Sequence, residues 1–125
     1  MRSGDTFLME PWSGGKRHLW VVVTEPDSES FECVIVSITT LRGNCDQTVV
    51  LQPGDHPFIR HPSVVFFADA RIVDARRLDQ AIGAGKCERH QPCSSELLAE
   101  VCKGIITSPH TPQKVIAFCK RAWRK

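Results

Sequence analysis

Five short runs of strand-favouring residues constrain the fold more than any other feature of the chain. Each run is rich in Val, Ile, Phe or Thr: TFLM at 6–9, HLWVVVT at 18–24, FECVIVSITTL at 31–41, QTVVL at 47–51 and HPSVVFFADARIV at 61–73. Turn-forming clusters separate them, namely SGG, EPDSES, RGNCDQ and QPGDHP. Because the connections are tight throughout, the pattern predicts a small antiparallel barrel rather than alternating strands and helices.

After residue 74 the apolar residues recur with the period of a helix. Asp74, Ser94 and Thr111 are side chains that cap helix N-termini, and each precedes such a stretch. We expect three short helices: one from Asp74 to a stop at Gly83, one from Ser94 to a stop at Gly104, and one capped by Thr111 with Pro112 at its first position. The predicted fold class is therefore mainly β with α, a barrel followed by C-terminal helices.

The chain has 125 residues, of which 42% are hydrophobic, and this is enough for one core. We expect a single domain over 1–125, with the barrel in 1–74 and a helical extension in 75–125 packed on it. No apolar stretch approaches the roughly 20 residues that cross a bilayer, and the start lacks the layout of a signal peptide. These features predict a soluble, cytoplasmic protein without membrane contact.

The six cysteines suggest reduced thiols rather than a disulfide framework, because the chain is too large to need one. Cys87, His90 and Cys93 recur every three residues and raise the alternative of a structural metal. No Cys-x-x-Cys pair occurs, and zinc sites usually contain one. We expect no metal and no cofactor.

The C-terminal segment is strongly basic. Residues 101–125 contain six Lys or Arg and no acidic residue, whereas the formal net charge of the whole chain is only +2. A cationic end of this kind suits contact with phosphate or with an acidic protein. It also suits an ordinary solvated helix end, where bases are favoured, and the sequence leaves both interpretations open.

Several short motifs in a fixed order point to a known family. They are Gly4-Asp5 at the first strand, Arg17 at the end of the loop before a Val-rich strand, Thr39 in VSITTL, and the stretch PSVVFFADARIVDARRL with Ser63, Asp69, Arg71, Arg77 and Leu78. Over residues 3–80 this order and spacing resemble the MazF/PemK toxins of type II toxin–antitoxin systems. The family commonly has Arg-Pro where this chain has Arg17-His18.

The resemblance implies an SH3-like barrel of the MazF/PemK/CcdB type and the activity of an RNA endonuclease. It implies RNA and an antitoxin protein as partners, and a homodimer with a groove across two barrels. It also places a catalytic Thr or Ser at Thr39 and a catalytic arginine at Arg17. An acidic residue near Asp69 has a role in some members.

The chemistry of RNA cleavage is compatible with these residues. RNA supplies its own nucleophile, the 2′-OH, so the protein needs only to move protons and to stabilise the crowded phosphate. Arg17 is our first choice for the phosphate, because a guanidinium grips two of its oxygens. Thr39 would position the phosphate or the 2′-OH by hydrogen bonding.

The proton acceptor is less defined by the sequence. His18 has a suitable side chain, although within a strand it would point away from Arg17. His56 and His61, together with Arg60, flank a turn and are alternatives. Asp69 is the remaining catalytic candidate, although a salt bridge between Asp69 and Arg71 is its more ordinary explanation.

RNA binding is expected at Lys16, Arg60, His61 and Arg71, and Trp12 lies on the loop before Arg17, where it would stack a base. The alternative function is a non-catalytic SH3-like module that holds protein or nucleic acid without cutting it. In that case Arg17 would be a solvated side chain, and Thr39 an ordinary strand residue.

Overall fold

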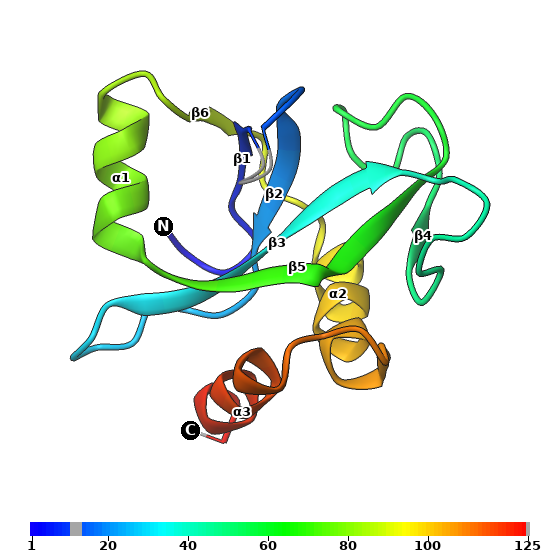
Figure 1. The fold of residues 1–125 in the computed structure, drawn as a ribbon. Helices are drawn as coiled ribbons and strands as arrows, with labels where there is room; N and C mark the ends of the chain where they lie inside the picture. Colours follow the sequence, from blue (N-terminus) through cyan, green and yellow to red (C-terminus); the bar gives the residue numbers. More distant parts are fainter. Residues whose placement is uncertain (11–13, 125) are drawn as a thin grey trace.

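A computed structural model of the chain describes residues 1–10 and 14–124. Its centre is one curled antiparallel sheet, a half-barrel, with the strand order β4-β5-β3-β2-β1-β6 (Figure 1). The strands are β1 (Thr6–Met9), β2 (His18–Val22), β3 (Glu32–Thr40), β4 (Val50–Leu51), β5 (Ser63–Asp74) and β6 (Glu88–His90). Each of the five predicted runs matches one of the first five strands, with β5 extending one residue beyond its run to Asp74, so the antiparallel β-fold expected from them is confirmed.

Three helices follow the long strand β5, and they make the fold a mixture of α and β rather than mainly β. They are α1 (Ala75–Gly83), α2 (Ser95–Thr107) and α3 (Gln113–Ala122). Two of the predicted caps are present: the Asp74 carboxylate accepts from the Arg76 amide at 2.8 Å, and the Ser94 hydroxyl oxygen accepts from the Leu97 amide at 3.1 Å. None of the described helices is long and apolar enough to cross a membrane.

The two faces of the sheet carry separate cores, because neighbouring side chains along a strand point to opposite sides. The larger core joins one face to α2 and α3 and includes Leu19, Val21, Val36, Ile38, Phe67, Val101, Ile105 and Val115. The smaller core joins the other face to α1 and includes Phe7, Trp20, Val22, Ile35, Ala75 and Leu78. Trp20 is fully buried, and its indole N–H donates to the Met9 carbonyl at 3.2 Å.

The sixth strand, β6, was not predicted. It pairs with β1 through Leu8↔Glu88, so the segment after residue 74 adds a strand to the sheet as well as helices. Its three residues, Glu-Arg-His, are all polar. They therefore lack the alternation of apolar residues by which a strand is predicted from sequence.

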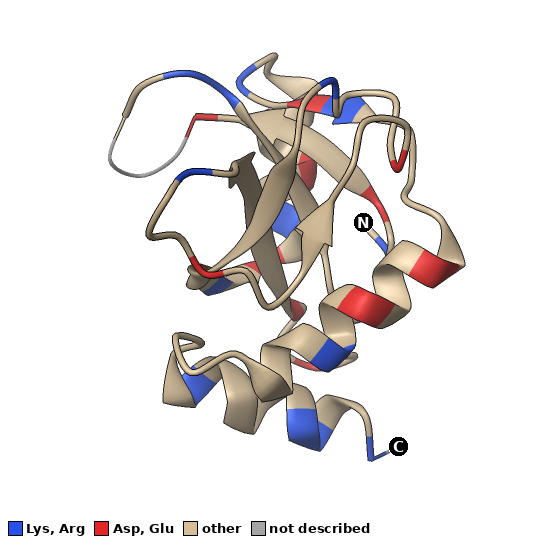
Figure 2. Cartoon of the chain, turned by 90° about the vertical axis from the view of Figure 1, so that its right-hand side faces the viewer, with Lys and Arg blue, Asp and Glu red and all other residues tan. Residues whose placement is uncertain are grey.

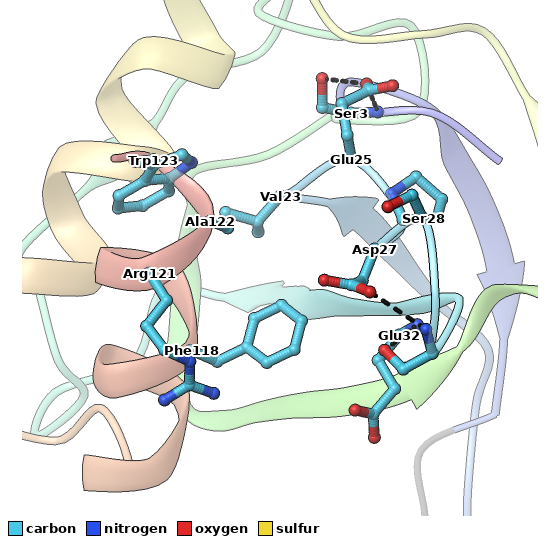
Figure 3. A pocket seen from close by; sticks show the side chains of 12 residues that line it. Ser3, Val23, Glu25, Asp27, Ser28, Glu32, Phe118, Arg121, Ala122 and Trp123 are labelled. Atoms are coloured by element: carbon cyan, nitrogen blue, oxygen red, sulfur yellow. Dashed lines mark hydrogen bonds between the residues drawn. The ribbon is translucent and has the colours of Figure 1, made fainter. Parts of the chain in front are cut away.

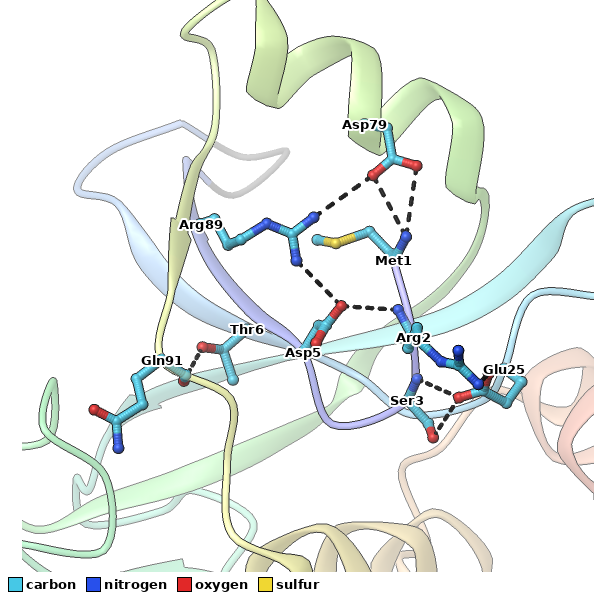
Figure 4. Close-up of polar contacts among 9 residues, drawn as sticks. All are labelled: Met1, Arg2, Ser3, Asp5, Thr6, Glu25, Asp79, Arg89 and Gln91. Atoms are coloured by element: carbon cyan, nitrogen blue, oxygen red, sulfur yellow. Dashed lines mark hydrogen bonds and ion pairs between the residues drawn. The ribbon is translucent and has the colours of Figure 1, made fainter.

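Polar contacts around the N-terminal segment hold β6 in place, as Figure 4 shows. The Thr6 hydroxyl donates to the Gln91 carbonyl at 2.6 Å. Arg89 reaches Asp5 at 3.2 Å and, in α1, Asp79 at 3.9 Å. These contacts connect β6 to β1 and to the helix that covers the smaller core.

Two predicted helix boundaries are wrong. Helix α2 does not stop at Gly104 but continues to Thr107. Gly104 lies inside the helix at a close approach, where a Cβ would collide with the Phe67 ring. Helix α3 begins one residue later than expected. Pro112 is its N-cap, and the Thr111 side chain is buried and does not cap it.

We predict that Gly104→Ala destabilises the protein by about 1–3 kcal/mol, because the added methyl group collides with Phe67 and Val49 in a filled core. Gly83→Ala is the matched control in α1, where a Cβ meets nothing within 4 Å. That variant should be neutral or stabilised by up to about 1 kcal/mol through helix propensity. Urea unfolding of both variants checks this, and equal behaviour of the two would contradict the close packing of α2.

Candidate functional site

The antiparallel register brings three chain segments to one end of the sheet. Strand β2 starts there, β3 ends there and β5 starts there, since Leu19 pairs with Ile38 and Thr40 pairs with Ser63. We call this end the rim and define it as residues 16–18, 39–42 and 60–63. Its segments contain Lys16, Arg17, Arg42, Arg60 and two histidines, but no acidic residue.

The cations of the rim are exposed, and Arg17 has a partner from outside it. Its guanidinium lies 3.6 Å from the Glu88 carboxylate of β6, and both side chains are open to solvent. An exposed pair of this kind contributes only about 0–1 kcal/mol. Arg17 can therefore exchange Glu88 for an anionic ligand at little cost.

Arg17 and Thr39 do not share a hollow. Glu88 lies beside Leu8, whose side chain belongs to the larger core, so the ion pair draws Arg17 toward that side of the sheet. Thr39 follows Ile38 of the larger core and therefore points to the other side. The next residue of β3, Thr40, points to the side of the sheet on which Arg17 lies.

Thr40 forms a contact that sequence reasoning missed. Its hydroxyl lies 2.9 Å from His61 Nε2, and the two groups are hydrogen-bonded at the exposed rim. The sequence offers His61 as an alternative proton acceptor but does not connect it with Thr40, which lies 21 residues away along the chain. The signal that would have found the pair is the register, which places Thr40 opposite Ser63.

His18 lies on the side of the sheet opposite to Arg17. It is the first residue of β2 and is half-buried, and its Nδ1 is buried without a hydrogen-bond partner among the described residues. Leu19 pairs with Ile38, and the next pair in the same register of β2 and β3 places His18 beside Thr39. The divergence of His18 and Arg17 that strand geometry predicts is therefore reproduced.

Asp69 and Arg71 form a salt bridge, which is the more ordinary of the two roles that the sequence suggests for Asp69. The Arg71 guanidinium lies 3.1 Å from Asp69, which also accepts from the Ser37 hydroxyl at 3.4 Å. The group lies where the pairing of β3 and β5 is shifted by a bulge, away from the rim. Because the carboxylate is engaged twice, it braces the bulge rather than standing free to accept a proton.

A hollow of about 340 Å³ adjoins the rim and is lined by both Thr39 and Thr40. Its apolar wall includes Phe66, which is 42% exposed, and its polar wall includes Thr39, Arg42, Asn44 and the acidic residue Asp46. An exposed aromatic ring beside a cation is a surface on which a base can stack. This hollow and the basic rim are neighbours through Thr39, Thr40 and Arg42.

His56 is a structural residue rather than a candidate base. It is only 2% exposed, its Nδ1 accepts from the Phe58 amide at 3.0 Å, and its Nε2 donates to the Gln91 carbonyl at 2.6 Å. This arrangement ties the loop between β4 and β5 to the chain that follows β6. Burial lowers the pKa of His56, as does the neighbouring His90, against the opposing effect of the Gln91 hydrogen bond.

Burial makes five of the six cysteines poor nucleophiles. All six lie in the described part of the chain and are free thiols. Burial raises the pKa of Cys33 to about 11 and that of Cys119 to about 12, and it also raises the pKa of Cys87, Cys93 and Cys102. Within residues 1–10 and 14–124, no group of three or more His, Cys, Asp or Glu is arranged to hold a metal.

Trp12, the predicted stacking residue, lies outside the described residues. Basic residues are also found at the other end of the molecule: Figure 2 shows Lys and Arg, in blue, both in loops at the upper end of the sheet and in the C-terminal helix. No family model, curated protein or solved structure matches the chain.

We predict that His56 makes folding stability depend on pH. Its folded-state pKa lies below the unfolded value near 6.5, so the unfolded chain binds more protons and stability falls as the pH drops below about 6.5, by up to about 1.4 kcal/mol per pH unit. Protonation of Nδ1 also removes the acceptor of the Phe58 amide. Thermal unfolding between pH 7.5 and 5.5 measures the effect.

His56→Gln should flatten this pH dependence, whereas His110→Gln, a change at an exposed histidine, should retain it. The carboxylates with lowered pKa values, such as Asp74, titrate below this window and do not interfere. An unchanged pH profile in His56→Gln would show that another group is responsible.

Proposed function

We propose that the half-barrel is of the SH3-like MazF/PemK type and that the chain is a metal-independent endoribonuclease toxin of a type II toxin–antitoxin system, acting on single-stranded RNA. The observation that carries the proposal is the meeting, at one end of the sheet, of the Arg17 segment with the hydrogen-bonded pair of Thr40 and His61. Cations for a phosphate and an imidazole for a proton are the two requirements of this chemistry.

The charge of the rim supports a polyanionic substrate. Lys16, Arg17, Arg42 and Arg60 are exposed, and the rim segments lack acidic residues. Spread over three segments, these cations can contact successive phosphates of a strand. Arg17 is proposed to hold the scissile phosphate, since its pairing with Glu88 is solvent-exposed and weak.

The proton steps are assigned to the pair at the rim. His61 accepts the 2′-OH proton, directly or through the Thr40 hydroxyl, as the O2′–P bond forms. The P–O5′ bond then breaks, the departing oxygen takes a proton from water, and the products are a 2′,3′-cyclic phosphate and a 5′-OH. Arg17 stabilises the charge that accumulates on the phosphate oxygens in between.

Thr39 retains a positioning role in this proposal. Its hydroxyl lines the hollow that contains the exposed Phe66 ring, and a nucleotide next to the scissile phosphate fits there. His18 neighbours Thr39 on the same side. Asp69 and Arg71 are proposed to act through the shape of the sheet and not through contact with the reacting atoms.

The partners follow from the resemblance and are part of the proposal. They are RNA as substrate, a homodimer as the active form, and an antitoxin protein that covers the cationic rim. An acidic antitoxin segment would compete with RNA for the same side chains. Growth arrest on expression of the chain alone, relieved by a neighbouring open reading frame, would support this assignment.

We predict that Arg17→Ala lowers the rate of cleavage of single-stranded RNA in EDTA by about a hundredfold or more, because the phosphate loses its principal stabilising group. Thr40→Ala and His61→Gln should also lower the rate while the protein remains folded. Arg77→Ala, a change at an exposed arginine of α1, is the control and should retain the wild-type rate. Mapping of the fragment ends identifies the cyclic phosphate.

Unimpaired cleavage by Arg17→Ala would remove this residue from the mechanism. Binding of RNA without any cleavage by the wild-type protein, over a range of sequences, would instead favour the non-catalytic SH3-like binding module. Strand scission that requires a divalent ion would overturn the metal-independent mechanism.

We further predict that Glu88→Gln tightens RNA binding by about twofold to fivefold at low salt, because Arg17 no longer has a competing carboxylate. The control is Glu96→Gln, which makes the same change of net charge on an exposed part of α2. Fluorescence anisotropy with a labelled single-stranded RNA measures both. Equal effects of the two substitutions would indicate that only net charge matters.

A further inference from the structure

A second hollow lies at the end of the sheet opposite the rim, and Figure 3 shows it from close by. Its volume is about 630 Å³. One wall is the loop of residues 25–32, which joins the end of β2 to the start of β3, and the other wall is α3 with Trp123. We call this hollow the acidic groove. Because it involves the opposite ends of β2 and β3, it is separate from the rim.

The helix wall and the floor of the groove are apolar. Phe118 and Ala122 come from α3, and Val23 follows β2. Trp123 is 40% exposed and lies beside the groove in Figure 3. An exposed indole above an apolar floor is the kind of anchor that recurs at protein interaction sites.

The loop wall is acidic, and this decides the charge of the occupant. Among the described lining residues, Glu25, Asp27 and Glu32 supply three carboxylates, against one guanidinium from Arg121. Arg2, which does not line the groove, pairs with Glu25 at 3.4 Å, so the excess negative charge rests on Asp27 and Glu32. The Arg121 guanidinium lies 5.8 Å from the centre of the Phe118 ring. In Figure 3 it is turned away from Glu25. An RNA strand would be repelled by this wall, and a cation would be attracted.

The acidic wall is held in position before any ligand arrives. Glu25 accepts from both the amide and the hydroxyl of Ser3 at 2.7 Å. Asp27 accepts from the amides of Glu29 and Ser30 at 2.8 and 3.0 Å. A preformed wall loses little conformational freedom when a partner binds, which favours affinity.

We propose that the acidic groove binds a basic peptide segment of a partner protein, with a lysine or arginine side chain lying between Trp123 and the loop carboxylates. The aliphatic stem of such a side chain packs against the indole and the apolar floor. Its charged head is attracted by the aromatic face and by the carboxylates at the same time. Neither wall alone offers both contacts, and the groove brings them together.

The test is a titration of the folded protein with a short fluorescein-labelled peptide of alternating lysine and glycine, followed by anisotropy. Glu32→Gln and Trp123→Ala should each weaken binding by about threefold to fivefold. Glu29→Gln is the matched control, because Glu29 belongs to the same loop but does not line the groove. That variant should bind as the wild type does.

Equal weakening by Glu29→Gln and Glu32→Gln would overturn the proposal, because only net charge would then matter. Tighter binding of a glutamate–glycine peptide would also overturn it and would assign the surface to the basic residues of α3. Self-association that Glu32→Gln abolishes would assign the groove to a second copy of the chain instead. The proposal does not rest on RNA cleavage: Arg17→Ala, at the opposite end of the sheet, should bind the peptide as the wild type does, whereas weakened binding would place the peptide elsewhere.

Discussion

The pairing of β3 with β5 is the interaction on which the rest of the structure depends. The ladder runs from Glu32↔Asp74 to Thr40↔Ser63, with one shift where β5 bulges. It is longer than any other pairing in the described sheet and connects both cores. Its one end forms the rim, and its other end adjoins the acidic groove. A single ladder therefore determines the separation of two surfaces with opposite charge.

The sequence contained most of the information for the sheet but not for its edge. Runs such as FECVIVSITTL bury apolar residues on both faces, and their composition identifies them without tertiary context. The caps Asp74 and Ser94 act through local hydrogen bonds and were predictable for the same reason. Strand β6 is held by contacts with residues more than 80 positions away, such as the one between Arg89 and Asp5. A pattern of neighbouring residues in the sequence cannot predict contacts over that separation. Gly104 was misjudged because its role depends on Phe67, a distant neighbour.

The candidate site was predicted in part. Arg17 and the histidines were selected by residue type and order, and several of them do gather at the rim. The alternation of side chains along β2 separates Arg17 from His18, but only the register of β2, β3 and β5 distinguishes the places of Thr39 and Thr40. Nothing in the sequence linked Thr40 to His61, because the hydrogen bond between them depends on how β3 and β5 are aligned. Asp69 and Arg71, in contrast, are close in sequence, and their pairing was the expected one.

The two outer strands of the sheet are β4, with two residues, and β6, with three. Such short borders present few unpaired backbone groups, and β6 also carries charged side chains, so the addition of a foreign strand gains little. Backbone-mediated extension of the sheet is thereby disfavoured, and amyloid-like stacking of this domain has no ready template. Any assembly that the chain forms must accordingly be specified by side chains, and a single substitution on a contacting face can alter it.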